Sequence, residues 1–164
     1  MKTVYIGIGS NLGNPLQNCF DSIDRIGKIP ECNIIGISGL YWTEPVGIDD
    51  QAWYVNGVVS ISTDISAQDL MNRLFEIEKD MGRIRNRHWE SRVIDLDMLL
   101  FGSDIIHEQG LTVPHPLMHK RRFVLAPMVD LAPDLKHPSF EKTMFELLQA
   151  IPEDKQIVKP VENR

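Results

Sequence analysis

The sequence predicts an α+β protein with a ferredoxin-like βαββαβ core, in which helices pack on an antiparallel sheet and C-terminal additions follow. The first supporting observation is the order of strand-like and helix-like segments over residues 3–101. The second is a capping residue at the start of each of the two helices expected in the core. The third observation is that short segments broken by prolines replace the regular spacing of apolar residues toward the C-terminus. A chain of 164 residues without repeats or linkers predicts one domain, residues 1–164.

The first strand and the first helix follow from local composition. Residues 3–9 are rich in β-branched and aromatic side chains, which predicts a strand. Asn14 can cap a helix with Pro15 at its first position, an arrangement that helices favour. Gly27 and Pro30 are placed to end that helix. Its apolar stripe at helical spacing comprises Leu16, Cys19, Phe20, Ile23 and Ile26.

The rest of the core follows the same logic. Residues 34–41 and 53–63 predict two further strands, separated by a loop rich in Pro, Gly and Asp. Ser66 can cap a second helix, which Gly82 would end. Residues 93–101 predict the fourth strand. The apolar stripe of the second helix comprises Leu70, Leu74, Ile77 and Met81.

The C-terminal part predicts shorter elements. Residues 104–107 suggest a short strand, and residues 112–118, which contain two prolines, suggest an ordered loop. Residues 120–131 predict a partly helical segment and residues 140–150 a terminal helix. Residues 156–161 predict a short strand or a tail.

Composition limits the class of protein. With 43% hydrophobic and 24% charged residues, the chain is typical of soluble globular proteins. No apolar run approaches the ~20 residues that span a bilayer, and the start lacks a signal-peptide pattern. Cys19 and Cys32 show no zinc-binding spacing, so free thiols in a reducing cytoplasm are expected. The net charge of −6 argues against a general nucleic-acid binder.

Two acids in an apolar strand are the strongest functional signal. Asp95 and Asp97 are two residues apart, so a strand places both on one face. Paired carboxylates in such a position require a cationic partner. That partner is either an upstream arginine or a divalent metal, and oxygen ligands favour Mg²⁺. The simpler alternative is a solvated edge strand whose acids pair with Arg83 or Arg92.

The basic residues before this strand are all arginine, at positions 83, 85, 87 and 92. Lysine would serve solubility equally well, whereas the planar guanidinium binds phosphate in a bidentate manner. The simpler alternative is a solvated charged segment. Arginines next to a carboxylate pair predict metal-assisted chemistry on a nucleotide.

Two further groups are candidates for ligand contacts. Tyr54 and Asn56 share a strand face, where an aromatic ring and an amide could hold a flat heterocycle. The alternative is one core aromatic and one strand-end amide. His115 lies between two prolines and near Arg121, which suggests a phosphate contact, although a lone histidine is usually structural. The five histidines lack metal-binding spacing.

The glycine-rich segment at residues 7–13 matches neither the dinucleotide-binding fingerprint nor the P-loop. The third glycine of the fingerprint is replaced by Leu12, and no GxxxxGK[ST] occurs. The segment therefore predicts a structural turn between a strand and a helix.

Together these motifs resemble the 6-hydroxymethyl-7,8-dihydropterin pyrophosphokinase family of folate biosynthesis over essentially the whole chain. The resemblance implies transfer of pyrophosphate from ATP to the hydroxymethyl group of the pterin, with release of AMP. It implies no nucleic acid, membrane or obligate protein partner. Besides Glu78, it is carried by residues 5–13 (YIGIGSNLG), 41–47 (YWTEPVG), 54–56 (YVN), 82–85 (GRIR), 92–97 (RVIDLD) and 111–116 (LTVPHP).

The resemblance also implies roles for individual residues. Asp95 and Asp97 would bind two Mg²⁺ ions that bridge the triphosphate, and Arg83 and Arg92 would contact phosphates. The positions that would line the ATP site are Glu78, Arg85, Trp89, Met98, Thr112, His115 and Arg121. The pterin would be sandwiched by the rings of Tyr54 and Phe123. Its polar contacts would be Thr43 and Asn56, and the enclosing loop would include Pro45 and Val46.

Two departures from the family pattern affect the nucleotide. Glu90 stands where the family usually has a small residue, and Gly110 stands where some members have an arginine. Nucleotide affinity would then depend more on Arg121 or Arg122. The alternatives to this family are another Mg²⁺-dependent nucleotide transferase and an RNA-binding module, which lacks its aromatic-rich strand here.

Overall fold

The computed structural model describes residues 1–45, 51–82 and 93–162. Its main sheet is six-stranded and antiparallel, in the order β5-β1-β4-β3-β8, with β2 also paired to β4. A separate hairpin joins β6 (Ile106–Glu108) and β7 (Leu111–Val113). The strands of the main sheet are β1 (Lys2–Ser10), β2 (Cys32–Ile37), β3 (Tyr41–Thr43), β4 (Tyr54–Thr63), β5 (Asp95–Phe101) and β8 (Val158–Pro160).

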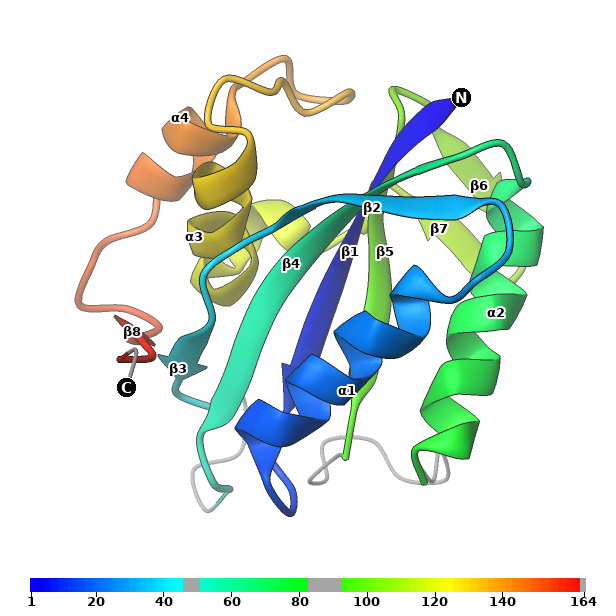
Figure 1. Ribbon diagram of the computed structural model, residues 1–164. Coiled ribbons are helices and arrows are strands. Elements are labelled where there is room, and N and C mark those ends of the chain that lie inside the picture. Colours follow the sequence, from blue (N-terminus) through cyan, green and yellow to red (C-terminus); the bar gives the residue numbers. More distant parts are fainter. Residues whose placement is uncertain (46–50, 83–92, 163–164) are drawn as a thin grey trace.

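The ferredoxin-like arrangement is confirmed. Strand β1 lies between β4 and β5, and the helices α1 (Pro15–Gly27) and α2 (Ala67–Asp80) cover one face of the sheet (Figure 1). Both predicted caps are present. The side chain of Asn14 accepts a hydrogen bond from the backbone N–H of Gln17, and Ser66 accepts one from Asp69, each at 3.1 Å.

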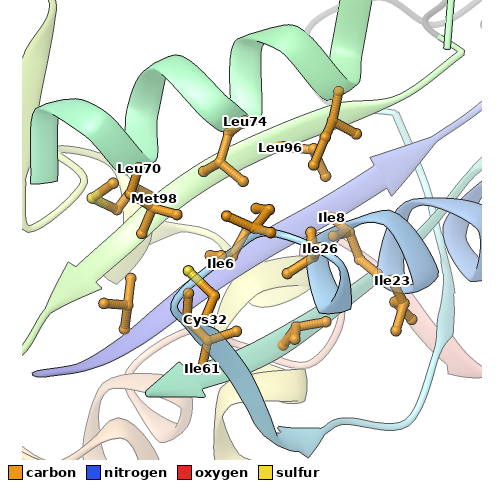
Figure 2. Packing of buried hydrophobic residues seen from close by; sticks show 14 of the residues in the cluster. Ile6, Ile8, Ile23, Ile26, Cys32, Ile61, Leu70, Leu74, Leu96 and Met98 are labelled. Atoms are coloured by element: carbon orange, nitrogen blue, oxygen red, sulfur yellow. The ribbon is translucent and has the colours of Figure 1, made fainter. Parts of the chain in front are cut away.

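The main core lies between α1, α2 and the sheet. Alternate residues of the strands point toward the helices because side chains alternate along a strand (Figure 2). Phe20, expected in the apolar stripe of α1, is 52% exposed and stands outside this core. The residues that meet in the core include Ile6, Ile8, Ile23, Ile26, Ile61, Leu70, Leu74, Leu96 and Met98.

The C-terminal additions form a second core on the opposite face. A short 3₁₀ helix η1 (Met118–Lys120) leads into α3 (Arg122–Leu131), and α4 (Met144–Gln149) packs on α3. Val58 of β4 and Leu99 of β5 point toward these helices. Figure 1 shows α3 and α4 gathered at one end of the molecule. The structure thus adds helices to the face that the basic ferredoxin-like arrangement leaves open, and part of that face stays available for a site.

Several predicted boundaries were wrong. The strand expected at residues 34–41 is divided into β2 and β3, because Gly39 donates its backbone N–H to Asp130 of α3 at 3.1 Å instead of continuing the ladder. The terminal helix starts at Met144 rather than near residue 140. Glu141 has a φ of +56°, which no helix accommodates, and Thr143 forms a capping box.

The structure also adjusts the bounds of two shorter predicted segments. The loop expected at residues 112–118 begins inside β7 and ends in η1. The strand predicted at residues 3–9 is confirmed as β1, which ends one residue later at Ser10, and the predicted turn to the helix follows it. In the part of the chain that the structure describes, no helix is long and apolar enough to cross a membrane.

Candidate active site

Two cavities meet at three side chains, two on β5 and one just after β7. The larger has a volume of about 570 Å³ and the smaller about 310 Å³. Asp95, Asp97 and His115 line both of them. Two of the three shared side chains are the carboxylates predicted to carry the chemistry.

The aspartates lie together because of their position in β5. Their neighbours Leu96 and Met98 are buried on the helix side, so Asp95 and Asp97 point to the other face, as predicted. On the adjacent strand, Gly9 pairs with Asp95 and Gly7 with Asp97. Because glycine has no side chain, neither of these positions adds a side chain next to the carboxylates.

Glu78 supports the same strand from beneath. Its side chain is fully buried in α2, and its Oε2 accepts a hydrogen bond from the backbone N–H of Leu96 at 3.1 Å. Leu96 lies between the two aspartates, so this bond ties α2 to the strand at the site. The ATP-lining position that the resemblance implied for Glu78 differs from this placement, because Glu78 is outside the linings of both cavities.

The larger cavity contains the four residues expected to bind a flat heterocycle: Thr43, Tyr54, Asn56 and Phe123. The amide Nδ2 of Asn56 donates to Thr43 Oγ1 at 2.6 Å, and both residues are almost completely buried. A Cβ atom at Gly9 would collide with Oδ1 of Asn56. The glycine therefore makes room for an amide whose orientation Thr43 holds. Rings and polar groups in one enclosed wall suit a flat, polar-edged ligand.

The smaller cavity combines apolar side chains with polar ones. Met98 and Thr112 line it, as the resemblance implied for an ATP site. Gly110 also lies here, with a φ of +79°. The cavity is completed by Met71, Phe75, Leu96, Leu111 and Pro116, together with the three shared side chains.

His115 is held as a neutral hydrogen-bond donor. Burial lowers the pKa of its imidazole to about 4, helped by the charge of Arg121 and opposed by Asp95. Its Nδ1 accepts the backbone N–H of Leu117 at 3.1 Å. At neutral pH the ring proton is therefore on Nε2, which can donate to an anionic ligand where the cavities meet.

Arg121 supplies positive charge to the larger cavity, whereas the resemblance associated it with ATP. It stands directly before α3, and its guanidinium carbon lies 5.4 Å from the ring centroid of Phe123. Its effect on the pKa of His115 shows that its charge acts at the junction. The neighbouring Arg122 turns elsewhere, because its Nη1 donates to the backbone carbonyl of Glu153 at 2.9 Å.

Some predicted residues lie outside the described residues: Val46, Arg83, Arg85, Trp89 and Arg92, together with Glu90. Their phosphate, nucleotide and pterin contacts stay predictions. Pro45 is described and half-buried, but the cavity wall is formed by its neighbour Glu44.

Sequence reasoning missed several residues of the larger cavity. Gly7 and Gly9 had a usable signal, because two glycines at i and i+2 in a strand open one sheet face. Gln156 had none, since it is far along the chain from the other lining residues. The remaining missed residues of this wall include Glu44, Gln51, Leu117 and Lys120. Those missed in the smaller cavity include Met71 and Phe75.

The donor set at the junction fits Mg²⁺. Among the described residues, no group of three or more His, Cys, Asp or Glu side chains could hold a metal ion. Two carboxylates side by side are the protein ligands that Mg²⁺ commonly takes when phosphate oxygens and water complete its octahedron. The pair therefore fits a metal that arrives with a phosphorylated ligand better than a permanently bound structural ion.

Known proteins of similar sequence include two that carry the same enzyme name. A relative in Pseudomonas aeruginosa, 2-amino-4-hydroxy-6-hydroxymethyldihydropteridine pyrophosphokinase, is 40% identical over 152 residues, which cover 93% of each chain. A Haemophilus influenzae protein of the same name is 38% identical over 157 residues, covering 96% of this chain and 98% of the relative. The Folic acid synthesis protein fol1 of Schizosaccharomyces pombe is 35% identical over 151 residues, but these make up 21% of its length.

Solved structures show the same fold. The crystal structure of Plasmodium falciparum HPPK-DHPS wild type with SDX-DHP matches with a TM-score of 0.70 at 14% identity. The match covers 92% of this chain and 43% of that chain, so the present protein corresponds to less than half of the solved one. The model of the family 7,8-dihydro-6-hydroxymethylpterin-pyrophosphokinase (HPPK) matches residues 5–133, which include most of β1, the strands β2 to β5, both carboxylates and α3. With a paired-carboxylate junction and relatives at 38–40% identity along almost their whole length, the chain belongs to the HPPK family.

Proposed function

We propose that this protein transfers pyrophosphate from ATP to the hydroxymethyl group of 6-hydroxymethyl-7,8-dihydropterin, giving AMP and the pterin diphosphate for folate biosynthesis. The observation that carries the proposal is the pair of cavities that share Asp95, Asp97 and His115. A two-substrate transfer requires two binding spaces that meet where the bond forms. Family membership supplies the chemical identity of the two substrates.

The larger cavity suits the pterin. The rings of Tyr54 and Phe123 would pack against the two faces of the bicycle, and the Asn56–Thr43 pair would bind its polar edge. Because Asn56 is held by Thr43, its amide loses little conformational freedom on binding. In this placement the hydroxymethyl group would face the aspartates.

The smaller cavity suits the nucleotide. Its apolar wall, which includes Met71, Phe75 and Met98, would cover the adenine, and Thr112 would add a polar contact. The triphosphate would then extend toward the junction, where His115 Nε2–H can donate to a phosphate oxygen. Arg121 would contact phosphate from the side of the larger cavity. Contacts from Arg83 and Arg92 belong to the same proposal.

Asp95 and Asp97 would hold two Mg²⁺ ions at the junction. Bound there with the triphosphate, Mg²⁺ supplies charge neutralisation and orientation of the phosphate oxygens. The carboxylates themselves are held by β5, which Glu78 anchors from beneath. A rigid strand is a suitable support, because transfer depends on placing the reacting atoms to within a fraction of an ångström.

The reaction asks mainly for positioning and charge stabilisation. The hydroxymethyl oxygen forms a bond to the β-phosphorus, and the bond from the β-phosphorus to the oxygen bridging it to the α-phosphorus breaks. The electron pair of that bond leaves with AMP. The hydroxyl proton is released, and the adjacent carboxylates would accept it. His115 and Arg121 would stabilise the negative charge of the phosphates. A cytoplasmic location accords with this chemistry and with the two free cysteines.

The direct test is product identification. Protein, MgATP and 6-hydroxymethyl-7,8-dihydropterin should yield AMP and the pterin diphosphate in equal amounts, measured by chromatography and ³¹P NMR. Formation of ADP with a pterin monophosphate would instead favour another Mg²⁺-dependent transferase. Absence of turnover with this substrate pair would contradict the proposal.

The metal assignment has a separate test. Asp97→Asn keeps the shape of the side chain but removes its charge, so turnover should fall about a thousandfold or more while the melting temperature changes little. Chelation of divalent ions should abolish wild-type turnover reversibly. The matched control is Asp104→Asn, just beyond β5, where Asp104 pairs with Lys2 at 2.9 Å on the surface. Equal activity of the Asp97 and Asp104 variants would refute the assignment.

A further inference from the structure

The larger cavity is completed by a segment beyond the region that the family model matches. The match ends at residue 133, whereas Gln156 lines the cavity together with Arg121 and Phe123. The chain returns there because β8 pairs with β3, with Val158 opposite Thr43 (Figure 1). A residue near the C-terminus is thus part of the wall proposed to bind substrate.

The side-chain amide of Gln156 binds the backbone on both sides of Arg121. Its Nε2 donates to the carbonyl oxygen of Lys120 at 2.9 Å, and its Oε1 accepts the N–H of Arg122 at 2.9 Å. The first bond holds the peptide group that precedes Arg121, and the second holds the one that follows it. The orientations of these two peptide groups determine φ and ψ of Arg121, and therefore the direction of its Cα–Cβ bond.

The same amide replaces a missing helix cap. Arg121 is the N-cap residue of α3, and its own side chain makes no capping hydrogen bond. The first N–H groups of a helix have no partner within the helix. Gln156 supplies that partner for Arg122 from 34 positions along the chain. The start of α3, which carries Phe123, consequently depends on the C-terminal segment.

Gln156 is itself held in place from two sides. The N–H of the next residue, Ile157, donates to Glu44 Oε1 at 2.8 Å, and the N–H of Glu44 donates to the carbonyl of Ile157 at 3.2 Å. On the other side, Arg122 Nη1 donates to the carbonyl of Glu153. Gln156 has a φ of +56°, a left-handed conformation that favours glycine. The two hydrogen bonds of its side chain and the two of its neighbours hold Gln156 in that conformation.

We propose that Gln156 is a positioning residue, which acts by holding Arg121 in the orientation required for phosphate contact during pyrophosphate transfer. The role given to Arg121 in this inference rests on the proposed function. The hydrogen bonds of Gln156 do not depend on it. Gln156 need not touch either substrate. Its effect on turnover should depend on the presence of the Arg121 side chain, because Gln156 acts through the backbone of Arg121.

The first variant is Gln156→Gly, chosen because glycine suits the φ of +56° while removing the amide. Turnover should fall about tenfold, with a melting temperature close to that of the wild type, since misplacing one charge-assisted contact costs about that factor. The matched control is Glu141→Gly. Glu141 has the same φ of +56° but lies outside both cavities, and its turnover should equal that of the wild type.

A double-mutant cycle with Arg121→Ala separates positioning from general damage. Turnover, and the Kd of α,β-methylene-ATP by calorimetry, are measured for the wild type, both single variants and the double variant. If Gln156 acts through Arg121, adding Gln156→Gly to Arg121→Ala causes no further loss. Multiplicative losses in the double variant, or a loss in Glu141→Gly as large as in Gln156→Gly, would overturn the inference.

Amide hydrogen exchange tests the clamp, meaning the two hydrogen bonds from the Gln156 side chain to the backbone of Lys120 and Arg122, without reference to activity. The N–H of Arg122 should exchange at least tenfold faster in Gln156→Gly than in the wild type, and the amide of Leu125, deeper in α3, should change much less. Unchanged exchange at Arg122 would overturn the clamp. If the wild type fails to form AMP but exchange at Arg122 responds as expected, the proposed function fails while the clamp stands. If AMP forms but the losses in the double variant multiply, the proposed function stands and the positioning role of Gln156 fails.

Discussion

At the scale of single residues, side chains alternate between the two faces of a strand, so neighbouring residues of β5 serve the site and the core in turn. Asp95 and Asp97 face the cavities, while Leu96 between them is buried and bonded through its N–H to Glu78. On β1, Gly7 and Gly9 lie opposite the two acids. A side chain on either glycine would occupy the face on which the substrates are proposed to meet.

Gly9→Ala should weaken pterin binding with little change in nucleotide binding. The new Cβ would press against Oδ1 of Asn56 and disturb the 2.6 Å hydrogen bond from Asn56 to Thr43. We expect the Kd of 6-hydroxymethylpterin to rise about tenfold, the order expected for one misplaced hydrogen bond of about 1.4 kcal/mol. Calorimetric titration measures it, with α,β-methylene-ATP as the internal control. An unchanged pterin Kd would contradict the role assigned to this glycine.

His115 should make stability depend on pH in the acid range. In the folded protein its pKa is lowered to about 4 by burial and by Arg121, while an unfolded histidine titrates near 6.5. Between these values the unfolded chain binds more protons, so the free energy of unfolding falls as the pH falls from about 6.5 to about 4. Urea unfolding at several pH values should show a shallower slope in His115→Gln than in the wild type. Identical slopes would mean that His115 titrates normally in the fold.

At the scale of elements, α2 performs two tasks with neighbouring rows of side chains. Leu70, Leu74 and Ile77 pack against the sheet, as the helical spacing predicted. Met71 and Phe75, one position further along, line the smaller cavity. Because residues four apart share a helix face, a single helix forms both the core and a wall of the site.

Adjacent substitutions on α2 should therefore have different consequences. Leu74→Ala should reduce the free energy of unfolding by about 2–5 kcal/mol, because Leu74 is fully buried and its removal leaves a void. Phe75→Ala, at a ring that is 37% exposed, should cost less stability but raise the Kd of α,β-methylene-ATP several-fold. Urea unfolding and calorimetry measure the two effects. The assignment of the smaller cavity to nucleotide would fail if Phe75→Ala bound the nucleotide as tightly as the wild type.

At the scale of the whole molecule, the two faces of the sheet carry two hydrophobic cores. One face packs against α1 and α2, and the other packs against α3 and α4 (Figure 1). The larger cavity includes residues at the start of α3, and the smaller one lies beside β5 and α2. Strand β8 adds the C-terminal segment to the wall of the larger cavity. Distant parts of the chain thus surround one junction of two carboxylates and a histidine.

Separate cavities predict that the two ligands bind together. α,β-Methylene-ATP with Mg²⁺ and 6-hydroxymethylpterin should raise the melting temperature more in combination than either does alone, because each binds the folded state at its own place. Differential scanning fluorimetry measures the shifts at saturating concentrations. Competition between them in a titration would show that both occupy the same cavity.

Much of this architecture was predictable because its causes are local. The caps at Asn14 and Ser66, the stripe of α2 and the shared face of Asp95 and Asp97 depend on residues a few positions apart. Motif spacing likewise identified the family, and Thr43, Tyr54, Asn56 and Phe123 do line one cavity. Phe20 shows the limit of this reasoning, since helical spacing placed it in the core and the fold leaves it exposed.

What the sequence by itself determined was the order of the elements, the family and the carboxylate pair, because periodicity, capping and motif spacing act over short distances. The tertiary structure decided what depends on contacts between distant segments. Asp130 divides the expected strand at Gly39, Glu78 ties α2 to β5, and Gln156 holds the start of α3. Each of these is a hydrogen bond between residues at least 18 positions apart, so its partner becomes identifiable only when the chain has folded.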